Sequence, residues 1–287
     1  MIIREALTQA CADLKNAGIE TVSLDASLLL AHVLDISRTA LAGRITEPFL
    51  EENLASFRAL IQRRIRGECI AYILGRKEFR NLEFHVNPSV LVPRPDTEIL
   101  VEAALEVIAG RRDDRIADNS YRVLDLCTGS GAVAISLKNE MPYLEIYATD
   151  ISQDALETAK ANAQRLLGEN QIHFYHGDLY NALPHSSFSL IVSNPPYIPS
   201  DEIEFLSDEV KNEPRIALDG GKCGLEIITR IIDGCPDFLQ SGGSVLLEAD
   251  PRQMEKIACL LEKKGFGNIK LYKDLSGNER IIGGKYE

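Results

Sequence analysis

The second half of the chain constrains the fold most, because short apolar segments alternate there with amphipathic ones. Runs rich in β-branched and aromatic residues are expected to be strands, and they cover residues 121–127, 144–150, 171–178, 189–195 and 243–250. Apolar positions recur at helical spacing between these runs, in residues 131–140, 152–167, 223–235 and 251–265. Such alternation predicts a parallel sheet with helices on both faces. Two further runs, 269–277 and 279–286, predict an antiparallel hairpin at the sheet edge.

The first predicted strand leads into a glycine-rich loop and then directly into a helix. The loop reads Asp125-Leu126-Cys127-Thr128-Gly129-Ser130-Gly131. Glycines allow a sharp turn and let a ligand approach the main chain closely. Asp150 ends the second strand about 20 residues after Gly129, where an acidic residue meets ribose hydroxyls in doubly wound nucleotide-binding folds. Asp178 ends the third strand at the same edge, so this edge is the predicted ligand site.

Two kinds of ligand fit this loop. Gly129, Gly131 and Ala134 also match the dinucleotide pattern, so a nicotinamide oxidoreductase or a non-catalytic nucleotide-binding module stays an alternative. Asp125, however, would repel a pyrophosphate and attract a ligand that carries an ammonium and a sulfonium group. This charge argument favours S-adenosylmethionine.

The fourth predicted strand ends in Asn194-Pro195-Pro196-Tyr197. Two prolines stiffen the loop and remove two backbone donors, which leaves carbonyl oxygens as acceptors. Together with the Asn194 side-chain carbonyl, they can accept both hydrogens of an NH2 group, and Tyr197 can supply a flat wall. Positioning a poorly nucleophilic, conjugated nitrogen in line with a methyl donor is the main requirement of such a transfer. A simple turn after a strand is the competing explanation, because Asn-Pro favours turns.

The first part of the chain has a different, purely helical pattern. Ile3, Leu7, Ala10 and Leu14 recur at helical spacing, and further helices are expected to start near Ser23 and Thr46. His32 lies in an apolar run and is expected in the core. Residues 72–92 alternate as a hairpin or linker does, and the polar residues 111–120 are expected to form a surface loop.

Composition limits the partners. The net charge of −12 argues against stable nucleic-acid binding, which usually needs a basic surface. No apolar run approaches the roughly 18 residues of a membrane span, and the N-terminus lacks a signal-peptide pattern, so we expect a cytoplasmic protein without membrane contact. The six cysteines are scattered without zinc-ligand spacing, and no metal site is expected.

These motifs together resemble a known family. The glycine loop, Asp150, Gly177-Asp178 and the Asn194–Tyr197 tetrad resemble the seven-stranded, class I (Rossmann-like) S-adenosylmethionine methyltransferase fold. The chain also resembles the PrmC/HemK family in the segments listed next. They are Gly75–Phe79, Phe84–Val86, Val90-Leu91-Val92-Pro93-Arg94-Pro95-Asp96-Thr97-Glu98, Glu213-Pro214-Arg215, Ala217-Leu218 and Gly220-Gly221. The resemblance covers nearly the whole chain.

The resemblance implies an activity and an organisation. Members of that family transfer a methyl group from S-adenosyl-L-methionine to the side-chain nitrogen (N5) of the glutamine in the Gly-Gly-Gln motif of peptide chain release factors, leaving S-adenosyl-L-homocysteine. It implies a small all-α substrate-recognition domain (1–72), a hairpin or linker (73–93) and an α/β methyltransferase domain (94–287). A monomer is expected. Methylation of a ribosomal protein glutamine, or of adenine N6 in nucleic acid, stays an alternative because both substrates present a conjugated NH2.

The resemblance also assigns residues. Asp125 and residues 127–131 (Cys127, Thr128, Gly129, Ser130, Gly131) would bind the methionine part of the cofactor. Asp150 and Ile151 would hold the ribose, Asp178 and Leu179 would border the adenine, and Asn194 would touch cofactor and substrate. Asn194, Pro195, Pro196 and Tyr197 would be catalytic and bind the glutamine amide, with Arg94, Thr97 and Glu98 beside them.

The chain departs from the family pattern at two of the assigned positions and leaves the role of one cluster open. Cys127 stands where glycine is common, and Leu179 stands where some members have an aromatic residue. Arg63, Arg64 and Arg66 are expected to be a solvated face. A docking patch for the protein substrate is the other hypothesis for them.

Overall fold

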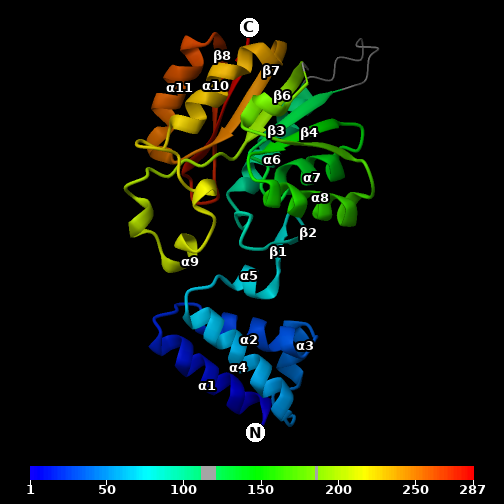
Figure 1. Cartoon of the computed structure of the whole chain (residues 1–287), viewed down its shortest axis with the longest axis vertical. Coiled ribbons are helices and arrows are strands. Elements are labelled where there is room, and N and C mark those ends of the chain that lie inside the picture. The colour runs from blue at the N-terminus through cyan, green and yellow to red at the C-terminus, as the bar shows by residue number, and fades with distance from the viewer. Residues whose placement is uncertain (111–120, 185–186) are drawn as a thin grey trace. The chain divides into compact units, whose positions relative to one another are not determined.

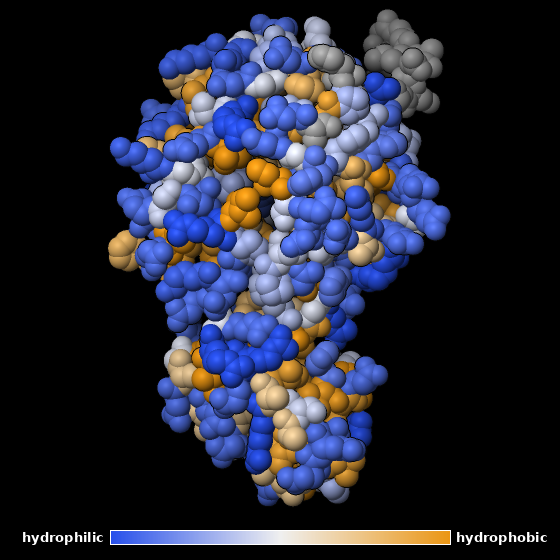
Figure 2. Space-filling model, viewed as in Figure 1, coloured by the Kyte–Doolittle hydropathy of each residue, from blue (hydrophilic) through white to orange (hydrophobic). Residues whose placement is uncertain are grey.

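The computed structural model describes residues 1–110, 121–184 and 187–287, so the predicted surface loop at 111–120 lies outside the described residues. The chain divides into two compact units. The first unit contains Met1–Gly75 together with Ser207–Asn212, and the second contains Arg76–Leu206 and Glu213–Glu287. Hydrophilic side chains cover most of the surface in view in Figure 2. Among the described residues, no helix has the length and apolar character needed to cross a membrane.

The first unit is built from helices (Figure 1). They are α1 (Ile3–Asn16), α2 (Val22–Val33), α3 (Arg38–Gly43), α4 (Glu51–Ile65), α5 (Ile70–Leu74) and α9 (Asp208–Lys211). α1, α2 and α4 pack against one another around a buried apolar core that includes Leu14, Leu29 and Phe57. The expected start of the third long helix near Thr46 is wrong. α4 begins at Glu51, because Pro48 forms an isolated bridge with Ile2 and Leu50 occupies the N-cap.

Two further expectations for this unit are wrong. His32 is exposed and not in the core. Arg64 is buried, at 2 % exposed, and therefore neither lies on a solvated face nor contributes to a docking patch. Its guanidinium pairs with Asp25, at 2.7 Å between Nε and Oδ2, and with Glu209. Arg63 is ion-paired with a nearby glutamate, and Arg66 is the exposed member of the three.

The second unit contains a seven-stranded sheet in the order β5-β4-β3-β6-β7-β9-β8. The strands are β3 (Arg122–Leu126), β4 (Glu145–Asp150), β5 (Ile172–His176), β6 (Phe188–Ser193), β7 (Leu239–Glu248), β8 (Phe266–Lys273) and β9 (Glu279–Tyr286). β3 to β7 are parallel, whereas β9 is antiparallel to β7 and to β8. This arrangement confirms the predicted parallel sheet with an antiparallel edge hairpin.

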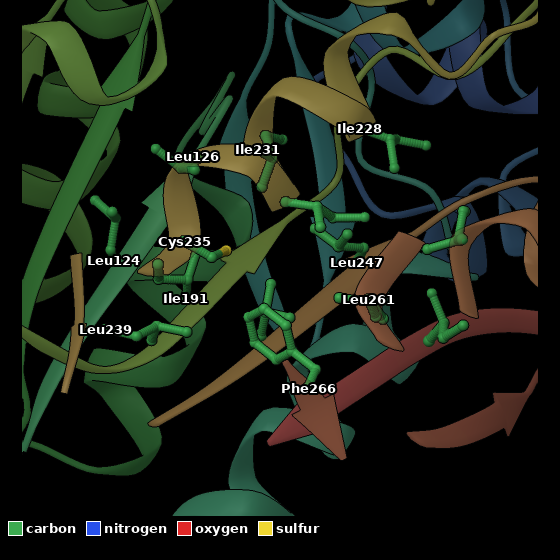
Figure 3. Packing of buried hydrophobic residues seen from close by; sticks show 14 of the residues in the cluster. Leu124, Leu126, Ile191, Ile228, Ile231, Cys235, Leu239, Leu247, Leu261 and Phe266 are labelled. Atoms are coloured by element: carbon green, nitrogen blue, oxygen red, sulfur yellow. The ribbon is translucent and has the colours of Figure 1, made fainter. Parts of the chain in front are cut away.

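Helices cover both faces of this sheet (Figure 1). On one face lie α6 (Thr97–Gly110), α7 (Ala132–Glu140) and α8 (Gln153–Leu167), and on the other lie α10 (Glu226–Phe238) and α11 (Met254–Lys263). Ile228, Ile231 and Cys235 of α10 form one apolar stripe that packs on Ile191 and Leu247 of the sheet, as Figure 3 shows. The expected start of α10 at Cys223 is wrong, because Gly224 has a left-handed conformation (φ +67°) that ends the preceding turn.

Short elements complete the second unit. The hairpin expected between residues 72 and 92 is formed by β1 (Arg76–Phe79) and β2 (Leu82–His85). Single turns of 3-10 helix are η1 (Leu179–Ala182), η2 (Ile203–Phe205), η3 (Arg215–Ala217) and η4 (Pro251–Gln253). Several of these turns follow the carboxyl ends of the parallel strands, at the edge where a ligand of an open α/β sheet binds.

Candidate active site

The sheet has its topological switch point between β3 and β6. These neighbours are parallel, yet the chain leaves β3 toward β4 on one side and leaves β6 toward β7 on the other. Ligands of open α/β sheets bind in the crevice outside the carboxyl ends of such strands. The glycine loop follows β3, and Asn194 follows β6. The two motifs found in the sequence therefore flank one crevice.

The glycine loop has a left-handed backbone at several positions. Gly131, the N-cap of α7, has a φ of +82°, and a Cβ there would lie 2.8 Å from Cδ1 of Ile135. Only glycine fits this position without displacing a neighbour. Cys127 also has a positive φ, +59°, which costs a non-glycine residue about 1 kcal/mol. This conformation explains why glycine suits position 127. Burial, and then the charge of Asp150, raise the pKa of the Cys127 thiol, so it is a neutral wall of the site.

Asp125 is buried and holds the glycine loop through hydrogen bonds. It is 1 % exposed. Its Oδ2 accepts hydrogen bonds from Thr128 Oγ1 at 2.6 Å and from the Ala134 amide at 3.3 Å. Burial raises the pKa of this carboxyl to about 7, although both hydrogen bonds oppose the rise. A cation bound beside Asp125 would favour its charged form.

Asp150 joins the ends of two strands. Its Oδ2 accepts a hydrogen bond from the Gly129 amide at 2.8 Å, and its Oδ1 accepts one from the Ser152 amide at 2.9 Å. Burial raises the pKa of this carboxyl, and the backbone hydrogen bonds oppose that rise. Each carboxylate oxygen can accept more than one hydrogen bond. Asp150 can therefore hold the glycine loop and still accept from a ligand hydroxyl.

The Asn194–Tyr197 loop is fixed by contacts with three other segments. The Asn194 side-chain amide donates from Nδ2 to Thr97 Oγ1 at 3.0 Å. Gln253 Nε2 donates to the Tyr197 carbonyl at 2.9 Å and to the Gly224 carbonyl at 3.2 Å. A Cβ on Gly224 would lie 2.1 Å from the Tyr197 carbonyl oxygen, so the close approach of these two backbones requires glycine.

One cavity of about 440 Å³ collects most of the predicted residues. Its size lies within the range of small-molecule and cofactor sites. The predicted residues that line it are Arg94, Thr97, Asp125, Cys127, Thr128, Gly129, Ser130, Asp150, Ile151, Asp178, Leu179, Asn194 and Pro196. In Figure 2, hydrophobic side chains border a hollow in the face of this unit that is in view.

Four predicted site residues do not line the cavity: Gly131, Pro195, Tyr197 and Glu98. Tyr197 packs against the apolar core instead of forming an open wall. Glu98 lies in the first turn of α6, and its Oε1 accepts a hydrogen bond from the Arg80 amide at 3.3 Å. Gly131 and Pro195 neighbour lining residues and shape the backbone of their loops.

One wall of the cavity is formed by residues that could not be assigned to the site from their side-chain chemistry. It contains Arg215, Ile216, Ala217 and Asp219, from the loop between β6 and α10. The only sequence signal for this wall was the resemblance of residues 213–221 to a family motif. Some of the other lining residues that were not assigned from the sequence come from the segment before α6 and from α10. They are Ser89, Val90, Leu91, Pro93, Ile227 and Arg230.

The charges of the lining favour a ligand with positive charge. Arg230 is paired with Asp178 at 2.6 Å, and Arg94 is paired with Glu213 at 2.5 Å. By contrast, within residues 1–110, 121–184 and 187–287, no lysine or arginine forms an ion pair with Asp125 or Asp150. These two carboxyls make the glycine-loop side the acidic side of the cavity, and a bound cation would favour their charged forms.

Comparisons with known proteins agree with this fold. A family model described as the PrmC N-terminal domain matches residues 5–75, and one described as the Methyltransferase small domain matches residues 112–210. A solved structure of a methyltransferase from Pyrococcus furiosus is similar in fold, with a TM-score of 0.51 and 19% identity over 79% of this chain and 96% of that one. The fold and site thus define a class I methyltransferase, not a nicotinamide oxidoreductase.

Relatives that match nearly the whole chain identify the family within this class. A release factor glutamine methyltransferase from Bordetella pertussis is 42% identical over 91% of this chain and 94% of the relative. Another from Geobacter sulfurreducens is 36% identical over 99% of this chain and 96% of the relative. The chain belongs to the release factor glutamine methyltransferase family.

Proposed function

We propose that this protein transfers a methyl group from S-adenosyl-L-methionine to N5 of the glutamine in the Gly-Gly-Gln motif of peptide chain release factors. The observation that carries the proposal is the shared cavity, in which Asn194 of the tetrad lies with the glycine loop and Asp150. Membership of the family supports the substrate class. The proposal includes a role in translation termination.

The residues present fit this cofactor. It carries an ammonium and a sulfonium, and the glycine-loop side of the cavity holds Asp125 and Asp150 without a paired cation among the described residues. Asp150, with Ile151, would hold the ribose hydroxyls, and Asp178 with Leu179 would border the adenine. Asp125 and residues 127–131 would receive the methionine part. When bound, the cofactor supplies an electrophilic methyl group on sulfur.

In this proposal, Asn194 positions the side-chain amide of the substrate glutamine. Its Nδ2 is engaged by Thr97, so its Oδ1 is the atom available to accept an N–H of the substrate amide. Pro195 and Pro196 carry no N–H, so the loop presents acceptors to the second hydrogen. An amide nitrogen held by two acceptors turns its lone pair toward the methyl donor, and fixed dipoles meet the positive charge that develops on nitrogen. The nitrogen gains the methyl group and releases one proton to solvent.

The first test is chemical. The full chain is incubated with methyl-labelled cofactor and a panel of release factors, ribosomal proteins and DNA, and the label is located by mass spectrometry. We expect the label on N5 of the Gly-Gly-Gln glutamine. Label on a ribosomal protein glutamine would change the partner but keep the chemistry, whereas label on adenine N6 in DNA would overturn the proposal.

The helical unit is proposed to recognise the protein substrate. We assign residues 1–72 to recognition, 73–93 to a linker and 94–287 to methyl transfer. The expected result is that an intact release factor has a KM at least about tenfold lower than a short peptide with the same Gly-Gly-Gln sequence. Equal KM values for peptide and intact protein would remove this role. We also predict that the protein is a monomer, that it is cytoplasmic and that it does not bind nucleic acid stably.

A further inference from the structure

Two of the segments that resemble the family meet at one buried carboxyl. The side chain of Glu213 is 1 % exposed. Its Oε1 accepts a hydrogen bond from Arg94 Nη2 at 2.5 Å, and its Oε2 accepts one from the Val92 amide at 3.0 Å. Pro93 lies between these two donors, and its ring stiffens the main chain there. Glu213 therefore fixes both the backbone that leads to Arg94 and the guanidinium itself.

The Arg94 side chain reaches the cavity from this fixed position. It is 35 % exposed and lines the cavity. Within the described part of the chain, Glu213 is the one residue that accepts a hydrogen bond from the Arg94 guanidinium. A guanidinium carries several N–H donors in a planar fork. The pair with Glu213 therefore leaves other N–H groups of Arg94 available to a ligand in the cavity.

The buried Arg64 of the helical unit provides a contrast within the same chain. Its side chain is 3 % exposed, and its guanidinium donates to Asp25, to Glu209 and to the main-chain carbonyl of Glu68. An arginine that is enclosed in this way has its donors occupied within the fold. Arg94 differs in both respects, because it has one such acceptor and borders a cavity.

Arg94 is also connected to the residue that would hold the substrate amide. The Thr97 amide donates to the Arg94 carbonyl at 3.1 Å, and Thr97 Oγ1 accepts from Asn194 Nδ2 at 3.0 Å. All three residues line the cavity. A glutamine side chain that is bound at Asn194 brings the peptide groups of its own segment to the mouth of this cavity.

The charge of the pair favours a neutral acceptor. Glu213 compensates the positive charge of Arg94, and a second carboxylate at the guanidinium would be repelled by Glu213 as well as attracted by Arg94. A peptide carbonyl carries no net charge and needs only a donor. In a Gly-Gly-Gln segment, the two glycines have no side chains to cover their carbonyl oxygens. Such oxygens are therefore suitable acceptors for the remaining N–H groups.

We propose that the Arg94 guanidinium donates to a main-chain carbonyl beside the target glutamine, and that Glu213 is the positioning residue that holds Arg94 for this contact. The inference rests on the proposed function, because it names the part of the same substrate that Arg94 binds. The contact holds the substrate segment and adds no chemical step to methyl transfer.

The first experiment removes the contact without leaving a buried charge. In the full chain, Arg94→Met combined with Glu213→Gln deletes the guanidinium and the carboxylate together. The KM for intact release factor should rise about tenfold or more, while kcat and the S-adenosylhomocysteine Kd change by less than about threefold. A wild-type KM would show that the ion pair is only structural and would overturn the proposal. A comparable loss of S-adenosylhomocysteine affinity would place Arg94 on the cofactor carboxylate and would overturn it too.

The second experiment tests the positioning role of Glu213. Glu213→Gln keeps the size of the side chain but replaces one of the two acceptor oxygens by an NH2 group. Although Arg94 is still present, the KM for release factor should rise about fivefold, again with little change in kcat. Arg76→Met is the matched control, because Arg76 is an exposed arginine that pairs with Glu83 and lies outside the cavity. It should leave KM within about twofold. An unchanged KM in Glu213→Gln would contradict the positioning role.

A binding measurement independent of turnover tests the nature of the acceptor. Labelled Gly-Gly-Gln peptides are prepared with one peptide linkage at or beside the glutamine replaced by an ester, whose carbonyl is a weaker acceptor. Their affinities are measured by fluorescence anisotropy at saturating S-adenosylhomocysteine. In the wild type, one ester peptide should bind about threefold or more weakly than the amide peptide. This difference should vanish in the double variant, as expected for two groups in direct contact. Equal ratios in both proteins for every ester peptide would refute the contact.

These results also separate the inference from the proposed function. If methylation of the release factor is normal and no ester peptide shows coupling to Arg94, the contact is rejected and the proposed function stands. If an ester peptide shows the coupling but no glutamine is methylated, the contact is supported and the proposed function alone is rejected.

Discussion

Replacing Asn194 with alanine will lower kcat about 10³-fold while the cofactor Kd changes by less than about threefold. The asparagine supplies a side-chain acceptor within the cavity, and alanine supplies none. Loss of one preorganised hydrogen-bonding group at a reacting centre costs about 10² to 10³ in kcat in well-studied hydrolases. An amide nitrogen is a weak nucleophile because its lone pair is delocalised into the carbonyl group. The rate of methyl transfer should therefore depend on this contact at least as strongly as the rates of those hydrolases do. Single-turnover transfer of labelled methyl, with calorimetry of S-adenosylhomocysteine binding, measures both effects.

The chain offers a matched control for this substitution. Asn181 is exposed in η1 and does not line the cavity, so Asn181→Ala removes the same side chain from the same unit. It should keep kcat within about twofold of the wild type. If Asn194→Ala also kept normal turnover, Asn194 would have no role in presenting the substrate. If instead Asn194→Ala lost cofactor binding as severely as turnover, its role would be in the cofactor pocket.

The sheet could be predicted from the sequence because its strands and helices are locally encoded. Strands buried on both faces appear in the sequence as continuous apolar runs. In the intervening helices, apolar residues recur at helical spacing. The order of these elements then places the ends of all parallel strands at one edge. For this reason Asp125, Asp150 and Asn194 could be assigned to one cavity before any distance between them was known.

The wall formed by residues 215–219 could not be predicted in the same way, because its position depends on long-range pairing. The Ile198 amide donates to the Leu218 carbonyl at 3.0 Å, and the Gly220 amide donates to the Ile198 carbonyl at 2.9 Å. These bonds fold the loop after β6 back on itself. No periodicity marks such a loop, so the family motif was the sole indication of its importance.

The errors in the helical unit have a related cause. Arg64 looked like one of three surface arginines, but it is buried because Asp25, 39 residues away in sequence, supplies a buried partner. The sequence of one helix does not show whether its arginine is buried, because burial depends on an acidic partner from another element. His32 lies in α2, whose apolar residues leave no sharply polar face, so the buried side of this helix was ambiguous.

Replacing Asp150 with alanine should raise the cofactor Kd about 100-fold. The carboxylate accepts from the Gly129 amide at 2.8 Å and from the Ser152 amide at 2.9 Å, so its removal loosens the glycine loop and also removes the proposed acceptor of the ribose hydroxyls. Hydrogen bonds to charged groups contribute about 1.5–3 kcal/mol each, and one such bond to the ligand gives roughly the expected factor. Calorimetric titration with S-adenosylhomocysteine measures the change.

Asp150→Asn tests the same contacts with a side chain of nearly the same size. An amide has one carbonyl oxygen, so one of the two backbone donors, Gly129 or Ser152, would face an NH2 group. We therefore expect a loss of cofactor affinity close to that of Asp150→Ala, because both the loop and the ribose contact suffer. Asp154→Ala removes an exposed carboxylate from the first turn of α8, outside the cavity, and should leave Kd within about twofold. Normal affinity in a folded Asp150→Ala protein would mean that the loop holds its shape alone and that the ribose lies elsewhere.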